Sequence, residues 1–323
     1  MIQKIYSHRY VMHSRRGLNS RSHTTEHEGA LIRVDVDGVS GFGCLHPWVE
    51  LGDSSLDDLL EEIQSGRSSR QVRCALECAE IDRRARATGV NLFDGLDVPK
   101  SHATIVGGID SIESAVVAGF DTVKLKMGRS ADYNLKLLGE THREFPNLKL
   151  RLDFNGVSSF SAIDEMLSQI GESLRERIDF IEDPYPFDNI SWNVLRDRYA
   201  MKFGVDRGLS QVDGEFDISV VKPAINDTDR ICNQAQLSGR SVVVTSYMDH
   251  PLGQCFAAYN AGKMNAEYLG VVNDCCGLMT HGLFDHDAFI EVMGDNTPTW
   301  NKSRNGIGFG FDDLLERLDW KIV

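Results

Sequence analysis

Between about residue 100 and residue 290, short apolar runs alternate with longer amphipathic segments. The runs are rich in Val, Ile, Leu and Phe, and their unbroken hydrophobicity is typical of parallel strands buried on both faces. The longer segments carry apolar residues at helical spacing. A strand–helix unit that recurs about every 20–30 residues predicts an α/β fold with a TIM-like barrel. The predicted strands are 103–106, 122–126, 148–154, 178–182, 202–206, 218–222, 241–245 and a weakly patterned eighth near 268–272.

Residues 1–98 follow a different pattern. Strands are predicted over 2–12 and 30–39, helices over 54–63 and 69–88, and loops over the stretches 13–29 and 41–53. Strands followed by helices favour an α+β module. We therefore expect an N-terminal α+β domain over 1–98, completed by about 290–323, and a barrel domain over 99–290.

A charged residue stands at the end of five successive predicted strands. Such a charge is costly next to a buried strand unless it is paired or binds a metal. The active site of a (β/α) barrel lies at the carboxyl ends of its strands, so these charges would share one polar site. In chain order they are Lys124 with Lys126, Asp153, Glu182, Asp206 and Lys222.

Three of these residues carry carboxylates on neighbouring strands. Asp153, Glu182 and Asp206 could converge on one cation, and an all-oxygen ligand set favours Mg²⁺, or Mn²⁺, over Zn²⁺. Each carboxylate taken singly would more often form an ordinary salt bridge with a lysine or arginine. Their joint position on consecutive strands favours the metal site.

The lysines could supply the acid and base groups. Lys124 and Lys126 are two residues apart, so both would point into the barrel unless this segment is solvated surface. Neighbouring positive charge would lower the pKa of Lys126, the lysine nearer the strand end, and make it a usable base. Lys222 would approach from the opposite side and donate a proton or stabilise an anion. A divalent metal with a lysine base suits removal of a proton next to a carboxylate, through an enediolate.

Overall charge narrows the range of partners. The formal net charge of −14 at pH 7 disfavours nucleic acid and anionic membranes, but local lysines and a metal would still attract a small anionic carboxylate substrate. The seven cysteines lack the spacing of a zinc site, which favours reduced thiols. No segment has the apolar length of a signal core or a membrane span, so we expect a cytoplasmic location. The sequence indicates no particular oligomeric state.

The order of these motifs resembles the muconate-lactonizing branch of the enolase superfamily. The matching pieces are VKLKMG (123–128), DFN (153–155), EDP (182–184), VD (205–206) and KPA (222–224). The resemblance implies a (β/α)7β TIM-like barrel with an N-terminal α+β capping domain. It also implies Asp153, Glu182 and Asp206 as Mg²⁺ ligands, and Lys126 and Lys222 as the acid–base pair on opposite faces of the substrate.

Within this branch the chain looks most like the o-succinylbenzoate synthases, which dehydrate a cyclohexadiene carboxylate in menaquinone biosynthesis. The resemblance includes TSYMDHPLG (245–253) and CGLMTHGLF (276–284), which would follow the last two strands. By analogy Lys126 would remove the α-proton and then protonate the leaving hydroxyl, with Lys222 as a cation across the ring. The chain departs from the family at Arg207-Gly208, where Glu-Ser usually follows the third metal ligand.

Three more residues near the predicted strand ends are candidates for supporting roles. Asn155 lies two residues beyond Asp153 and would form hydrogen bonds around the metal ligands, unless it only shapes the turn. Ser246 and Asp249 would contact either the metal ligands or the substrate, and Asp249 stands where this family commonly has Glu.

The N-terminal module could add residues to the same site. The polar loop that carries Arg15, Arg16 and Arg21 could close over the barrel and bind a substrate carboxylate, although solvation alone explains each arginine. His46 and Trp48 could line the pocket or pack internally.

Other functions fit parts of the same pattern. A dipeptide epimerase or a muconate-type cycloisomerase would use the same metal and lysine pair on another substrate. A non-catalytic barrel used for binding would be indicated by the loss of a ligand or a lysine, and all of them are present. A phosphate-binding barrel would need a Gly-rich loop between a strand and a helix, which the sequence lacks.

Overall fold

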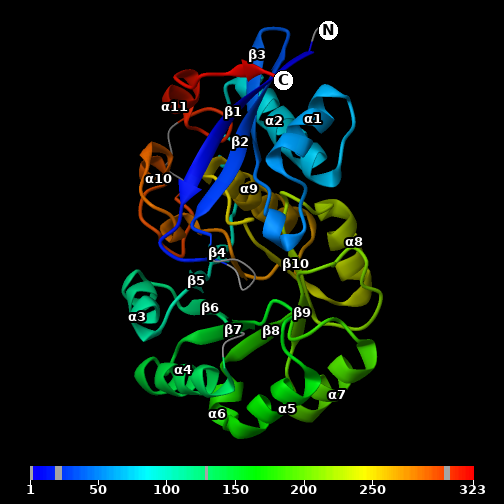
Figure 1. Cartoon of the computed structure of the whole chain (residues 1–323), viewed down its shortest axis with the longest axis vertical. Helices are drawn as coiled ribbons and strands as arrows, with labels where there is room; N and C mark the ends of the chain where they lie inside the picture. Colours follow the sequence, from blue (N-terminus) through cyan, green and yellow to red (C-terminus); the bar gives the residue numbers. More distant parts are fainter. Residues whose placement is uncertain (1–2, 19–23, 128–129, 302–305) are drawn as a thin grey trace.

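The computed structural model describes residues 3–18, 24–127, 130–301 and 306–323, so Arg21 and the Gly128 of the VKLKMG motif lie outside the described residues. Figure 1 shows a layer of long N-terminal strands that stands above a ring of short strands and helices. The long strands belong to one sheet and the short strands to another, so the two parts are built on separate hydrogen-bonding networks.

An antiparallel sheet in the order β13-β1-β2-β3 forms the N-terminal layer. β1 (Gln3–His13) pairs along its length with β2 (Glu26–Val36), and β2 pairs with β3 (Val39–Leu45). The two-residue turn between β2 and β3 has φ of 51° at Asp37 and 82° at Gly38, as a type I′ hairpin requires. β13 (Lys321–Ile322) pairs with β1, so a segment from beyond the barrel adds the fourth strand.

Two helices cover one face of this sheet. Side chains of α1 (Leu56–Gln64) and α2 (Arg70–Thr88) form one buried apolar cluster with alternate residues of β2. The predicted helices are therefore confirmed. Ser55 caps α1, because its hydroxyl accepts a hydrogen bond from the backbone N–H of Asp58.

The prediction that 41–53 is a loop is wrong, because most of β3 lies within it. Gly41 and Gly43 look like loop residues in the sequence. In the fold they let α2 pack directly on the strand, since a Cβ at either position would collide with a backbone carbonyl oxygen of Ala79 or Ala75. The 3-10 helix η1 (Val49–Leu51) occupies part of the remaining stretch.

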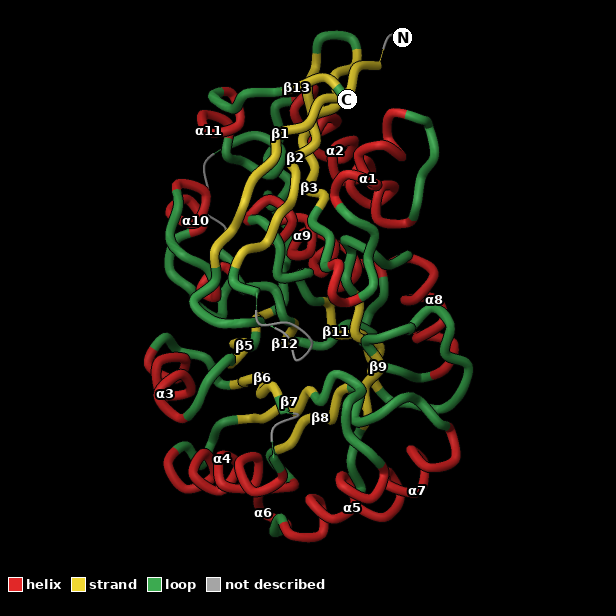
Figure 2. The backbone as a smooth tube through the Cα atoms, in the orientation of Figure 1, coloured by secondary structure: helices red, strands yellow, loops and turns green. Residues whose placement is uncertain are grey.

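Within the described residues, seven parallel strands form one curled sheet in the order β11-β10-β9-β8-β7-β6-β5 (Figure 2). Seven predicted strands are thereby confirmed to within two residues at each end. The strands are β5 (Ala103–Ile105), β6 (Thr122–Lys126), β7 (Lys149–Asp153), β8 (Ile178–Glu182), β9 (Phe203–Val205), β10 (Ile218–Val221) and β11 (Ser241–Val244).

A short eighth strand closes the ring. β12 (Cys275–Cys276) pairs with β4 (Lys100–Ser101), and Thr245 after β11 bridges Gly277 after β12. The prediction of this strand near 268–272 is only partly right, because Val272 forms a parallel bridge with Val242 of β11 but β12 itself lies at Cys275–Cys276. The helix before it runs on to Glu267, and the segment that follows turns at Gly270, where φ is 74°.

The helices connect successive strands on the outside of the ring (Figure 1). Helices α3 to α9 lie between the barrel strands in the sequence. The 3-10 helix η2 and the helices α10 and α11 follow the last barrel strand. They are α3 (Ile109–Val117), α4 (Ala131–Glu144), α5 (Phe160–Gln169), α6 (Glu172–Arg175), α7 (Asn189–Tyr199), α8 (Thr228–Ser238), α9 (Pro251–Glu267), η2 (His281–Leu283), α10 (Ala288–Met293) and α11 (Asp312–Glu316).

Strand alternation separates the two faces of the barrel sheet. Phe180, Ile218, Val220 and Val243 form a buried cluster of their own, apart from the larger core that contains side chains of the surrounding helices. Glu182 lies two residues after Phe180, on the same side of its strand. An apolar cluster therefore lies next to the polar residues at the strand ends.

The predicted fold class, an α/β barrel with an N-terminal α+β part, is confirmed. The division into 1–98 with about 290–323, and 99–290, stays a prediction. Among the described residues, no helix combines the length and hydrophobicity needed to cross a bilayer. All seven cysteines lie in the described part of the chain, and none forms a disulfide.

Candidate active site

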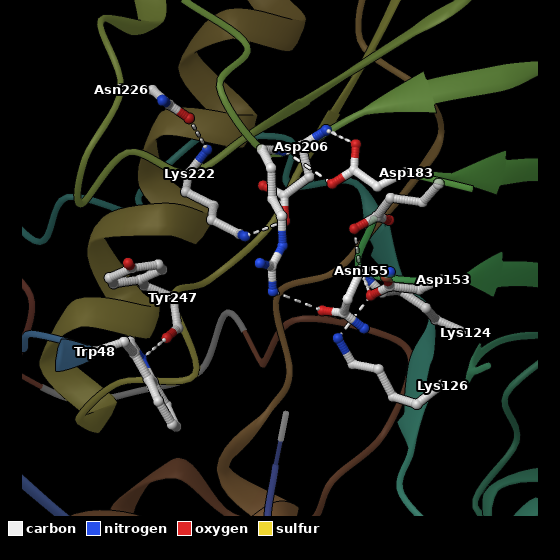
Figure 3. Close-up of polar contacts among 12 residues, drawn as sticks. Trp48, Lys124, Lys126, Asp153, Asn155, Asp183, Asp206, Lys222, Asn226 and Tyr247 are labelled. Atoms are coloured by element: carbon white, nitrogen blue, oxygen red, sulfur yellow. Dashed lines mark hydrogen bonds and ion pairs between the residues drawn. The ribbon is translucent and has the colours of Figure 1, made fainter. Parts of the chain in front are cut away.

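Lys126, Asp153 and Glu182 form one row across three neighbouring strands. Each is the last residue of its strand, and the sheet register pairs Lys126 with Asp153 and Asp153 with Glu182. Lys222 follows β10, four positions around the ring from β6. It therefore approaches from the opposite side, as Figure 3 shows.

Lys126 and Lys222 line a cavity of about 390 Å³. Asp153 and Glu182 are not among its lining residues, but both contact Lys124, which lines it. The N-terminal layer contributes part of its wall through Leu51 and Asp53. Six of the residues singled out in the sequence line it, together with the Arg207-Gly208 pair that was noted only as a departure from the family. The six are Lys124, Lys126, Asn155, Asp206, Lys222 and Ser246.

Lys124 joins two of the carboxylates. Its Nζ lies 2.6 Å from Glu182 Oε1 and 2.9 Å from Asp153 Oδ2. Burial lowers the pKa of Lys124, but the charges of Asp153, Glu182 and Asp206 outweigh burial and raise it. Lys124 is thus held protonated and acts as a counter-ion for the carboxylates.

Lys126 and Lys222 each pair with a different carboxylate. Lys126 Nζ lies 2.6 Å from Asp153 Oδ2, and Lys222 Nζ donates a hydrogen bond to Asp206 Oδ2. Burial raises the pKa of Asp153, but its two lysine neighbours outweigh burial and hold that pKa well below its usual range. All three predicted carboxylates therefore carry an ammonium partner.

The donor set suits a hard divalent cation, because it consists of carboxylate oxygens. Lys124 stands between Asp153 and Glu182, so one positive charge already occupies the space between these two carboxylates. Asp206 faces Lys222 instead. No group of three His, Cys, Asp or Glu side chains in the described part of the chain is gathered closely enough to hold a metal as it stands. The residue types therefore fit a magnesium site. In this structure, however, lysine ammonium groups take the positions next to the carboxylates that a cation would need.

Asp183 is a functional candidate that the sequence interpretation missed. Its Oδ1 and Oδ2 accept hydrogen bonds from the backbone N–H groups of Asp206 (3.1 Å) and Arg207 (3.0 Å). Burial, together with the charges of Asp206 and Glu182, raises the pKa of Asp183 to about 8. Asp183 thereby ties the end of β8 to the segment that carries Asp206, and the EDP motif was its one visible signal.

Asn155 occupies the position expected from the sequence. Its backbone N–H donates to Asp153 Oδ1 at 2.9 Å, and its side-chain Oδ1 accepts a hydrogen bond from Arg207 Nη2 at 3.3 Å (Figure 3). Asn155 has a φ of 53°, a left-handed conformation that Asn adopts more readily than most residues. The turn directs the side chain toward Arg207, so the contact with Asp153 is made by the backbone of Asn155 and its supporting role stays a prediction.

Ser246 and Asp249 differ in their surroundings. Ser246 lines the cavity, and its hydroxyl forms a hydrogen bond of 2.8 Å with that of Thr280. Asp249 is not among the residues that line the cavity; it is 1% exposed and packs closely against Gly253. Burial raises the pKa of Asp249 to about 7.

A chain of contacts joins the N-terminal layer to Lys222. Trp48 Nε1 donates to the backbone carbonyl of Tyr247 at 2.7 Å, and the Tyr247 hydroxyl donates to Asp53 Oδ2 at 2.9 Å. Lys222 Nζ lies 5.6 Å from the centre of the Tyr247 ring, within cation–π range. The first of these contacts is visible in Figure 3. Sequence inspection pointed to Trp48 but not to Tyr247 or Asp53.

The remaining N-terminal candidates lie elsewhere. Arg15 and Arg16 line a separate cavity of about 420 Å³, beside the first strand and helix of the barrel. His46 is buried, and its Nδ1 forms a hydrogen bond of 2.9 Å with the Tyr10 hydroxyl. His46 therefore packs internally.

A family model and a relative of known name both point to the same family of proteins. The model of the o-succinylbenzoate synthase N-terminal domain matches residues 5–85. An o-succinylbenzoate synthase from Bdellovibrio bacteriovorus is 33% identical over 99% of this chain and 98% of its own length.

Solved structures share the fold at low sequence identity. Muconate lactonizing enzyme from Pseudomonas putida is 16% identical with a TM-score of 0.76, over 98% of this chain and 99% of its own. A dipeptide epimerase from Enterococcus faecalis, complexed with Mg and the dipeptide L-Leu-L-Tyr, is 14% identical with a TM-score of 0.78, over 95% and 98%. At these identities the likeness concerns the barrel and its N-terminal layer. Together with the match along nearly the whole chain, it shows that the protein belongs to the o-succinylbenzoate synthase family, a family of lyases within the enolase superfamily.

Proposed function

We propose that this protein is a Mg²⁺-dependent o-succinylbenzoate synthase, which dehydrates a cyclohexadiene carboxylate in menaquinone biosynthesis in the cytoplasm. The observation that carries the proposal is the 33% identity to a named o-succinylbenzoate synthase over 99% of the chain. The cavity supports it, because Lys126, Lys222 and Asp206 line it. Asp153 and Glu182 contact Lys124, which lines the same cavity.

Lys126 is the proposed base. It lines the cavity at the end of β6, and its side chain keeps 18% of its surface exposed, whereas Lys124 beside it keeps 9%. As a free amine, Lys126 takes the proton next to the substrate carboxylate. The same group then returns a proton to the departing hydroxyl, so both events occur on one face of the ring, as a syn elimination requires.

Lys222 is the proposed electrostatic partner. It lies across the ring of strands from Lys126 and lines the same cavity, where its positive charge stabilises the enediolate anion. Its contacts with Asp206 and the Tyr247 ring hold the ammonium in place before substrate binds. Fixed charge of this kind stabilises the transition state without reorganisation.

Asp153, Glu182 and Asp206 are the proposed Mg²⁺ ligands. Mg²⁺ bound there would hold the substrate carboxylate and take up negative charge as the proton leaves. Asn155 and Asp183 would support these ligands, since Asn155 contacts Asp153 and Asp183 binds the backbone of Asp206.

The test is turnover of the cyclohexadiene substrate, followed by the ultraviolet absorbance of the aromatic product, with and without Mg²⁺. We expect product only with the metal. A dipeptide epimerase would instead exchange the α-proton of dipeptides in D₂O and form no aromatic product. A cycloisomerase would act on muconate. Failure to turn over any of the three substrates would favour a binding role for the barrel.

A further inference from the structure

Arg207 is unusual among the cations of the cavity. Lys124, Lys126 and Lys222 each pair with a carboxylate. Within the described residues Arg207 has no such partner, and its guanidinium makes one side-chain hydrogen bond, of 3.3 Å, to the neutral Asn155 Oδ1. A half-buried guanidinium with most of its donors unused favours an anionic ligand.

Asn155 adds an independent donor to the same place. Its Nδ2 is buried and has no hydrogen-bond partner among the described residues, although the side chain lines the cavity. Because Oδ1 accepts from Arg207, the amide is oriented with Nδ2 free to donate. A buried donor left unsatisfied costs stability, so a ligand that accepts its hydrogen bond would bind with added affinity.

We infer that Arg207 and Asn155 form a subsite for one carboxylate of the substrate. The Asn155 amide lies beside Lys126 in Figure 3, and its Oδ1 accepts the hydrogen bond from the Arg207 guanidinium. A carboxylate oxygen can accept from Asn155 Nδ2 while the guanidinium binds the same group, which uses both sets of free donors. The subsite rests on the proposed function, because that function supplies a ligand with two carboxylates.

The subsite takes the succinyl carboxylate, not the ring carboxylate. The ring carboxylate adjoins the proton that leaves, so it must face the groups that stabilise the enediolate, which are Lys222 and the metal that the proposed ligands would hold. The second carboxylate remains for Arg207 and Asn155. A substrate without that group would leave the donors unpaired in the cavity, so the pair selects for dicarboxylates.

The experiment measures binding of three ligands by calorimetry in the presence of Mg²⁺. o-Succinylbenzoate has both carboxylates, 2-butanoylbenzoate lacks the succinyl carboxylate, and 4-oxo-4-phenylbutanoate lacks the ring carboxylate. We expect Arg207→Met to weaken binding of the first and third ligands about 10- to 100-fold, the range for hydrogen bonds to charged groups. Binding of 2-butanoylbenzoate should stay unchanged.

Two further variants guard against an indirect effect. Asn155→Asp keeps the left-handed turn and adds a carboxylate beside Arg207, so it should weaken the same two ligands. Arg230→Met removes an arginine of α8 that lies outside the cavity lining and should change none of the three affinities. In turnover, Arg207→Met should raise KM more than it lowers kcat.

The outcomes separate the inference from the proposed function. If wild type forms product but Arg207→Met binds all three ligands like wild type, the subsite is refuted and the function stands. Equal weakening of 2-butanoylbenzoate would mean that Arg207 acts on the ring carboxylate or on the cavity as a whole, which also refutes the subsite. If wild type neither forms nor binds o-succinylbenzoate, the proposed function fails, and the subsite fails with it.

Discussion

Replacing Asp249 by Asn should change how the stability of the protein depends on pH. The Asp249 carboxyl is 1% exposed, and its Oδ1 has no hydrogen-bond partner among the described residues. Burial raises its pKa from 3.8 to about 7. Above that pH the folded chain must hold a buried negative charge that has no ion-pair partner in the described part of the structure, whereas the unfolded chain carries the same charge in water.

The sign and size follow from proton linkage. Between about pH 4 and pH 7 the folded state binds a proton that the unfolded state has released, so stability falls as pH rises through this window. A shift from 3.8 to about 7, at ~1.4 kcal/mol for each pKa unit, amounts to about 4 kcal/mol. Asn has nearly the same shape but no charge, so the variant should escape this loss.

The assay is urea denaturation of wild type and Asp249→Asn, followed by circular dichroism at several pH values and constant ionic strength. From about pH 5 to pH 8, the unfolding free energy of the variant should rise by about 3 kcal/mol relative to wild type. Asp94→Asn, at an exposed position, should run parallel to wild type. Parallel pH profiles for wild type and Asp249→Asn would show that the reasoning about burial is mistaken.

Three other predictions concern the site and the N-terminal layer. Lys126→Ala should lower turnover by at least about 1,000-fold with an unchanged circular dichroism spectrum, and near-normal turnover would eliminate Lys126 as the base. Chelation of divalent ions with EDTA should abolish turnover, and Mg²⁺ or Mn²⁺ should restore it; full activity in EDTA would contradict the metal site. Gly43→Ala should cost about 3 kcal/mol or more in urea unfolding, because its methyl group meets the α2 backbone, whereas Gly139→Ala, in open space on α4, should stabilise by up to ~1 kcal/mol. Equal effects of the two substitutions would argue against the close helix–strand contact.

The barrel strands could be predicted where an apolar run ends abruptly at a charged residue. β6 and β8 end at Lys126 and Glu182 as the sequence indicates, because the change from apolar to charged residues coincides with the end of burial. The eighth strand was misplaced because β12 is two residues long and is defined by its pairing with β4, which lies far away in the sequence. Apolar pattern alone could not distinguish it from the turn before it.

The candidate site was only partly predictable for a similar reason. The charged residues at strand ends could be identified from the sequence, because a charge next to a buried apolar run is costly unless it has a function or a partner. Asp183 and Arg207 were not assigned roles, because their contacts depend on turns. Asp183 has a φ of 41°. This backbone turn directs its carboxylate to the backbone N–H groups that follow β9, away from the row of strand-end residues to which Glu182 belongs. Such a change of direction is invisible to strand alternation.

The pairing of β13 with β1 has a consequence for biosynthesis. Residues 321–322 join the edge of a strand that begins at residue 3, and every barrel strand lies between them in the sequence. During translation the ribosome therefore delivers the barrel before the N-terminal sheet can acquire its fourth strand, and that edge of β1 stays open to other strands meanwhile. A nascent chain stalled after the barrel should accordingly be more prone to aggregate than a chain that includes β13.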